Sequence, residues 1–143
     1  MIAWLKNVGV YLICAVAATA LARWIESPVA TEVVLPNLIT MVTALLAINV
    51  QTTAVIAVKL RELADKHEVD FSKSINQFNL AFYEQGALIL IALALSAVSK
   101  SELVIMSTQI LECATFFVLL ASLHIFLDTT IGLLTCLFPE GHD

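Results

Sequence analysis

Four ionisable side chains that fall inside long apolar stretches are the residues best able to do chemistry: Glu84, Glu112, His124 and Asp128. His124 and Asp128 are four positions apart, so on a helix they lie one above the other, which suits a metal pair or a proton relay. No third ligand is evident in the sequence, so we interpret them as a structural pair near a membrane boundary.

The sequence contains none of the motifs that mark common catalytic sites. There is no Gly-x-Ser-x-Gly, no His-Glu-x-x-His and no phosphate-binding loop. The cysteines, Cys14, Cys113 and Cys136, lie in apolar runs without a Cys-x-x-Cys pair, which favours inert thiols over a disulfide framework or a zinc site. We therefore expect no enzyme activity, no metal and no cofactor.

A second candidate site is a polar seam inside the apolar run 33–58. Small or polar residues recur there at alternating spacings of four and three, namely Thr40, Ala44, Ala47, Gln51, Ala54 and Val58. One hypothesis is a pore lined by Thr40, Thr43, Ala47 and Gln51, with Glu84 and Glu112 as ion-attracting carboxylates. The alternative is a packing seam that lets a neighbouring helix approach closely.

The elements that carry these residues are predicted to be membrane-spanning helices. Of the 143 residues, 60% are hydrophobic and 13% are charged, whereas a soluble domain carries about 25% charged residues. At about 20 apolar residues per crossing, the apolar stretches and their connectors use nearly the whole length. We predict an all-α integral membrane protein, a single membrane domain over 1–143 built as a four-helix bundle.

The expected crossings are about 2–22, 36–58, 79–98 and 103–127. The first resembles a signal peptide, because Lys6 precedes it and a small-residue motif ends it, but its apolar amino terminus favours a retained helix. Pro36 suits the first turn of the second crossing, where its missing amide hydrogen costs nothing. The fourth stretch, 103–138, is too long for one straight crossing, so 113–138 is the alternative span.

The two glutamates differ in their predicted depth. Glu84 lies about one turn inside the boundary of the third crossing. Its alternative roles there are to gate a pore or attract ions, to pair with a basic residue, or simply to reach the membrane interface. Glu112 lies about ten residues from the outer end of a 103–127 crossing, and a central acid costs about 2.5–3.5 kcal/mol to insert. We therefore expect Glu112 to be protonated, to face a neighbouring helix or to line water.

The distribution of basic residues predicts the orientation. With the amino terminus inside, five bases lie inside (Lys6, Lys59, Arg61, Lys66 and Lys73) and two outside (Arg23 and Lys100). The positive-inside rule then places both termini and the connector 59–75 in the cytoplasm. The net charge of −5 and the scattered bases give no indication of nucleic-acid binding.

The connector 59–75 is predicted to be helical, continuing the second crossing out of the membrane. Its opposite charges at i, i+4 contribute only a few tenths of a kcal/mol each. It is either a solvated hairpin or a docking surface for a cytoplasmic effector protein, made by Lys59, Arg61, Lys66 and Phe71.

The segment Phe82-Tyr83-Glu84-Gln85-Gly86-Ala87-Leu88, which opens the third crossing after a basic connector, resembles the RexB exclusion proteins of lambda-like phages. Glu84 and Gly86 match by position, whereas the Ala-rich first crossing departs from that family. Similar four-helix proteins are membrane subunits of anti-phage systems such as Kiwa. The resemblance implies a protein of the bacterial inner membrane in phage defence or exclusion, either an ion channel that depolarises the membrane or a subunit with a cytoplasmic partner.

These observations lead to two hypotheses of function. The first is a homo-oligomeric pore in the lipid bilayer, for which a tetramer is favoured because one four-helix chain is too small to enclose a water path. The second is a membrane-embedded sensor or scaffold that recruits an effector through residues 59–75.

Overall fold

The chain folds into four long helices joined by short connections. The computed structural model describes residues 2–67, 72–101 and 107–137. The helices are α1 (Ile2–Trp24), α2 (Leu35–His67), α3 (Ser72–Ser99) and α4 (Thr108–Leu137), with one turn of π-helix, η1 (Val29–Val34), before α2. All four helices are long and apolar enough to cross a membrane, which confirms the predicted all-helical class.

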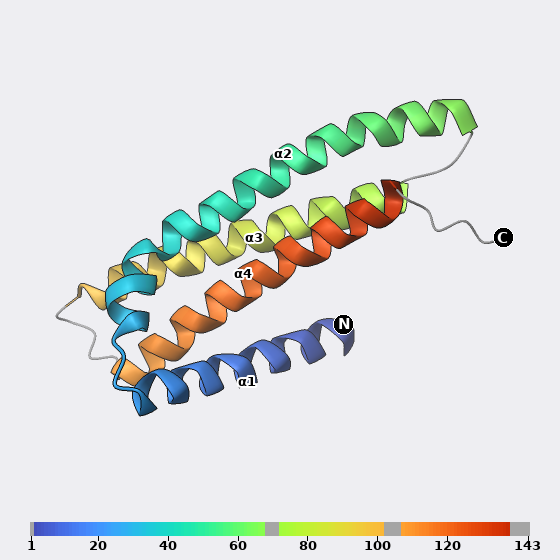
Figure 1. Cartoon of the computed structure of the whole chain (residues 1–143). Helices are drawn as coiled ribbons and strands as arrows, with labels where there is room; N and C mark the ends of the chain where they lie inside the picture. Colours follow the sequence, from blue (N-terminus) through green and yellow to red (C-terminus); the bar gives the residue numbers. More distant parts are fainter. Residues whose placement is uncertain (1, 68–71, 102–106, 138–143) are drawn as a thin grey trace.

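The helices run alternately up and down, so α1 and α3 are antiparallel to α2 and α4 (Figure 1). The "Trp24 end" of the bundle is where α1 and α3 finish and where α2 and α4 begin, and the "His67 end" is the opposite end. Within the described residues α4 packs against all three other helices, whereas α1 packs only against α4 and η1. The amino-terminal end of α1 stops short of the His67 end, so α2, α3 and α4 continue past it (Figure 1).

The packed core belongs to α2, α3 and α4. Leu38 and Val42 of α2 are completely buried, as is Ala92 of α3, and they pack with Val118 and Ala121 of α4. Each helix contributes a stripe at spacings of three and four residues, the pattern of an amphipathic helix that buries one face. This close-packed centre leaves α1 at the side of the bundle.

Most apolar side chains point away from the protein, as expected for helices surrounded by lipid. Ile13 is 70% exposed, Leu90 67% and Ile131 61%. Exposed apolar surface on this scale is rare in soluble monomers. The outward faces of all four helices are therefore suited to hydrocarbon.

The end of α1 is closed by a turn that needs a left-handed residue. The amide of Ser27 donates to the Ala22 carbonyl at 2.8 Å, and the amide of Glu26 donates to the Arg23 carbonyl at 3.0 Å. This pair of bonds is a Schellman motif, and it places Glu26 at φ 54°. Glycine is the usual residue at this position, so Glu26 carries local backbone strain.

Pro36 lies in the first turn of α2, as the sequence predicts. No irregular segment precedes this turn, because the π-helical turn η1 runs directly into α2. A proline ring clashes with the carbonyl four residues earlier in a regular helix, and a widened turn before Pro36 relieves that clash. The chain thus reverses in the turn at residues 25–28 and then passes from η1 into α2 without a break in the helical backbone.

The fourth helix differs from the expected 103–127 crossing. It begins at Thr108 and continues to Leu137, and residues 102–106 lie outside the described part. The apolar window within it is Thr108–Gly132, which lies between the two spans considered from the sequence. Hydropathy could not place the start because residues 103–106 are apolar as well.

The contact of α1 with α4 depends on small residues. Ala15 has no exposed surface, so Ala15→Leu should force the two helices apart and lower the free energy of unfolding by about 1–3 kcal/mol. The measurement is reversible unfolding of the purified protein in mixed micelles. Ala20→Leu is the control, since Ala20 is exposed on the opposite side and should change stability little. Equal effects of the two substitutions would contradict this packing.

Candidate functional site

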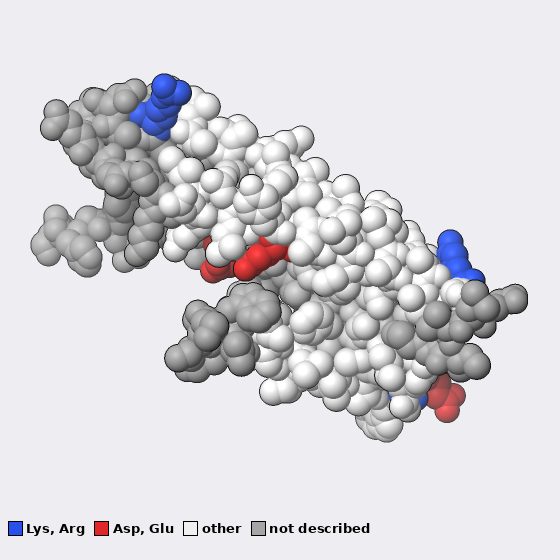
Figure 2. All heavy atoms as spheres, turned by 180° about the vertical axis from the view of Figure 1, so that it is seen from behind, with Lys and Arg blue, Asp and Glu red and all other residues white. Residues whose placement is uncertain are grey.

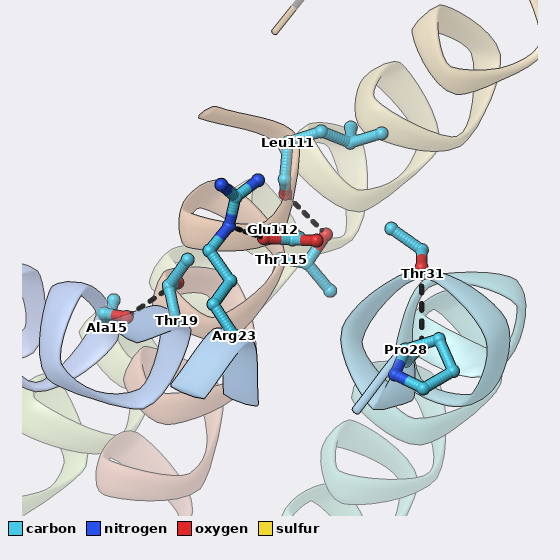
Figure 3. A network of polar contacts seen from close by, with 8 residues as sticks. All are labelled: Ala15, Thr19, Arg23, Pro28, Thr31, Leu111, Glu112 and Thr115. Atoms are coloured by element: carbon cyan, nitrogen blue, oxygen red, sulfur yellow. Dashed lines mark hydrogen bonds and ion pairs between the residues drawn. The ribbon is translucent and has the colours of Figure 1, made fainter. Parts of the chain in front are cut away.

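At the Trp24 end, α1 and α4 are joined by an ion pair. The Nε of Arg23 donates to the Oε2 of Glu112 at 2.9 Å (Figure 3). The Glu112 side chain is only 13% exposed, whereas that of Arg23 is 40% exposed. The carboxylate is therefore the partner that needs the bond, because a largely buried charge without a partner is costly.

Two threonines beside the ion pair bond within their own helices. Thr19 donates its hydroxyl to the carbonyl of Ala15, and Thr115 donates to that of Leu111, both at 2.8 Å (Figure 3). Each hydroxyl is thereby satisfied without a partner on the neighbouring helix. The buried surface between α1 and α4 can then be close-packed although it contains polar residues.

A second polar contact joins α2 to α3 nearer the His67 end. The Nδ2 of Asn49 donates to the Oε1 of Gln85 at 3.0 Å, and both side chains are buried. The Nε2 of Gln85 is also buried but has no hydrogen-bond partner among the described residues. The pair therefore leaves one donor unsatisfied.

Glu84 and Asp128 lie next to this amide pair, on the surface between α3 and α4. They are close enough for the charge of Asp128 to act on Glu84. Figure 2 shows acidic side chains together part-way along the molecule, with basic side chains towards its ends and a further acidic side chain at one end. Glu84 is half-buried and Asp128 is exposed.

His124 contacts an aromatic ring rather than Asp128. The rings of Tyr11 and His124 have centroids 5.2 Å apart, and Tyr11 also packs edge-on against Phe117 at 6.2 Å. Among the described residues no hydrogen bond or ion pair joins His124 to Asp128, and no group of three His, Cys, Asp or Glu side chains is placed to hold a metal ion. Through these two ring contacts, Tyr11 anchors the middle of α1 on α4.

The charged residues define two levels with an uncharged slab between them. Sixteen positions separate Glu112 from Asp128 on α4, and sixteen separate Glu84 on α3 from Lys100, which directly follows α3; this is about 24 Å along a helix. No Asp, Glu, Lys or Arg lies between these levels on any helix. The slab is a little thinner than the hydrocarbon core of a bilayer, about 30 Å, and Glu112 lies at one edge of the slab.

The polar seam of α2 faces outward. All six of its residues are exposed: Thr40, Ala44, Ala47, Gln51, Ala54 and Val58. At about 100° per residue, they lie opposite the buried face formed by Leu38, Val42 and Asn49. By contrast, the small residues Ala15 and Ala22 of α1 are buried against α4.

The threonines of α2 differ from the buried and part-buried threonines of α1 and α4. Thr19, Thr115, Thr129 and Thr130 each donate to the carbonyl four residues earlier. In the part of the chain that the structure describes, the hydroxyls of Thr40 and Thr43 make no hydrogen bond, and neither do those of the part-buried Thr52 and Thr53. Unbonded hydroxyls in hydrocarbon are unfavourable, so this outward face needs water or another polar surface.

The structure does not gather the predicted pore residues into one place. Thr40, Thr43, Ala47 and Gln51 share the outer face of α2, whereas Glu84 lies beside α4 and Glu112 faces α1. A shared role of these six residues in a pore between chains stays a prediction.

The predicted docking residues lie on or beyond the extension of α2. Lys59 and Arg61 are exposed there, and the helix continues to His67. The side chain of Lys66 and the whole of Phe71 lie outside the described residues. Their role in docking stays a prediction.

Sequence reasoning missed two interhelical contacts. Asn49 lies 18 positions before the end of α2 and Gln85 lies 13 positions after the start of α3, so counting residues from the connection brings the two only approximately to the same level. The expected first crossing, 2–22, leaves Arg23 outside the helix, whereas Arg23 lies in the last turn of α1. Because hydropathy does not locate the start of α4, the sequence gives no indication that Arg23 and Glu112 are close in space.

The ion pair should be detectable by a double-mutant cycle. Arg23→Gln should destabilise the fold more than Glu112→Gln, because it leaves the more buried charge alone. The double variant Arg23→Gln with Glu112→Gln should lose less free energy of unfolding than the two single losses added together, with a coupling of about 1 kcal/mol. Unfolding in mixed micelles measures all four proteins. Strictly additive effects would show that the contact contributes nothing.

Comparison with protein-family models gives no match, and comparison with curated proteins and with solved structures gives none either. The resemblance to the RexB exclusion proteins stays a prediction. The contacts described above are the basis on which a function is proposed.

Proposed function

We propose that this chain is a homo-oligomeric protein of the bacterial inner membrane that forms a pore or depolarising assembly along the outer face of α2, in phage defence or exclusion. The observation that carries the proposal is the outward polar seam of α2. Its orientation follows the basic residues, with both termini and the His67 end in the cytoplasm.

A single chain has no room for a water path through its centre. Leu38 and Val42 fill the space between α2, α3 and α4 with side chains that have no exposed surface. A conducting path therefore has to form between chains. The seam of α2 is suited to this, because its residues are either small enough for close approach or able to bond water.

The contrast between α1 and α2 supports the same view. Both helices carry a small-residue face, but α1 uses its face inside the chain, where Ala15 and Ala22 are buried. The face of α2 has no such partner within the described residues. A second copy of the chain supplies an equivalent seam, and closed symmetry brings each copy of the seam to a common axis.

The chemistry of the seam indicates the kind of pore. Hydroxyls from Thr40 and Thr43 and the amide of Gln51 are neutral, and no charged residue lies on α2 between Glu32 and Lys59. Such a lining offers hydrogen bonds to water without binding one ion strongly. We expect low selectivity among small ions, as suits a protein that depolarises a membrane. Four chains are the favoured number.

A second candidate, a scaffold for a cytoplasmic effector, rests on the length of α2. Beyond Lys59, where the uncharged run ends, the helix continues for eight residues to His67. Lys59 and Arg61 are exposed on this extension. Charge reversal at both positions should abolish recovery of a partner in a pull-down if the extension is the dock.

The oligomer can be tested by cysteine cross-linking. With the native cysteines replaced by alanine, Ala47→Cys should give disulfide-linked dimers when membranes are treated with copper phenanthroline, because the α2 seams of two copies meet. Leu90→Cys is the matched control: it is 67% exposed, on α3, within the same uncharged slab. Equal dimer formation at both positions, or none at Ala47, would overturn the α2 interface.

Conduction can be tested by ion flux from liposomes that contain the purified full chain. Thr43→Val and Gln51→Leu should reduce flux by about an order of magnitude, because an apolar constriction expels water. Thr130→Val is the control, since that hydroxyl already bonds to the Phe126 carbonyl and should leave flux unchanged. No flux at any applied potential, or equal loss with all three variants, would contradict the pore.

A further inference from the structure

A groove between α2 and α3 adjoins the outer face of α2 and shares Ala54 with the polar seam. It has a volume of about 230 Å³, and residues of α2, α3 and α4 line it, among them Asn49, Thr53, Phe78, Phe82, Gln85 and Thr129. Such a volume holds roughly seven or eight groups the size of a water molecule. The groove therefore accommodates part of a ligand, not a whole lipid.

The polar feature of the groove is an unsatisfied amide. Gln85 has no exposed surface, and its carbonyl oxygen already accepts a bond from Asn49. Its Nε2 has no partner among the described residues. Because buried donors are almost always bonded in folded proteins, this nitrogen requires an acceptor that the described residues do not supply.

The remaining lining indicates the type of acceptor. None of the residues that line the groove is charged or is a histidine. The rings of Phe78 and Phe82 and several alanines and aliphatic side chains form apolar walls. A phosphate or carboxylate would find no counter-charge there, so the acceptor is neutral and is attached to an apolar body.

The position of the groove points to the source of this acceptor. Fifteen positions separate Gln85 from Lys100, and twenty-two separate Phe78 from Lys100, which is about 22 Å and 33 Å along the helix. A hydrocarbon core of about 30 Å that starts at Lys100 ends between these two levels. The groove thus crosses the boundary at which the glycerol esters of one leaflet lie.

We infer that this groove binds a carbonyl oxygen carried on an apolar body, with Gln85 Nε2 as the donor, and that the ester group of a membrane phospholipid supplies it. Asn49 acts as a positioning residue, because its bond to the Gln85 carbonyl turns the amide nitrogen towards the ligand. The inference does not depend on the pore, because the donor Gln85 lies on α3 and the seam contributes only Ala54 to the groove.

The test uses the full chain with ¹⁵N-labelled glutamine side chains in lipid nanodiscs. Diacyl phosphatidylglycerol is compared with dialkyl phosphatidylglycerol, which has the same headgroup and charge but ether oxygens in place of ester carbonyls. Methyl laurate added to the dialkyl discs is the free carbonyl probe. Gln85→Leu assigns the signal by its loss. We expect the Gln85 amide protons to move downfield in the diacyl discs relative to the dialkyl discs.

Two further variants separate binding in the groove from a general effect of the lipid. Ala81→Leu fills the groove, since Ala81 lines it, and should abolish the difference between diacyl and dialkyl discs. Ala87→Leu, on an exposed position of α3 outside the groove, should keep it. If Ala81→Leu does not fold, native mass spectrometry decides instead: the wild type should retain more diacyl than dialkyl lipid, and Asn49→Leu with Gln85→Leu should lose that preference.

The outcomes are distinct. A shift in diacyl discs supports the phospholipid ester, and a shift only with methyl laurate supports the site with a free apolar carbonyl compound as its ligand. Identical spectra in all three conditions, or a shift that persists in Ala81→Leu, would overturn the inference and leave water as the partner of Gln85. Loss of the pore activity would not affect this result.

Discussion

The close approach of the other helices to α4 is the packing on which the rest of the structure depends. α4 is the one helix that contacts α1, α2 and α3 among the described residues. Apart from Val118, its buried positions are small or hydroxyl-bearing, including Thr115, Ala121 and Ser122. In hydrocarbon, helices gain little from hiding apolar surface, so association relies on such close contacts. The ion pair at Glu112 and the tyrosine contact at His124 then fix α1 along this helix.

The sequence predicts the number and type of elements well, because uncharged runs of this length are favourable in lipid only as helices. It predicts which residues share one face of a helix, but not which other helix packs against that face. The small residues of α1 and those of α2 have the same periodic pattern, yet Ala15 is buried and Ala47 is exposed. Periodicity shows which residues share a face, whereas the helix that covers the face depends on the tertiary arrangement.

The two polar contacts between helices differ in the same way in how far the sequence predicts them. The start of α4 could not be predicted from hydropathy, because residues 103–106 are apolar like most of those that follow Thr108. Arg23, the partner of Glu112, is 89 positions away in the sequence, too far for any local pattern. The Asn49–Gln85 bond is more accessible, since counting residues from the short connection between the antiparallel helices brings the two approximately to the same level.

The attachment of α1 to the bundle through α4 has a consequence for biogenesis. α1 leaves the ribosome well before α4, its main partner, so α2 and α3 are synthesised while the buried face of α1 is still uncovered. Contacts between distant parts of the chain form late. During that interval Arg23 lacks Glu112, and the Ala15–Thr19–Ala22 face is open to other helices. Emergence of α4 is then the step that covers this face and commits α1 to its own chain.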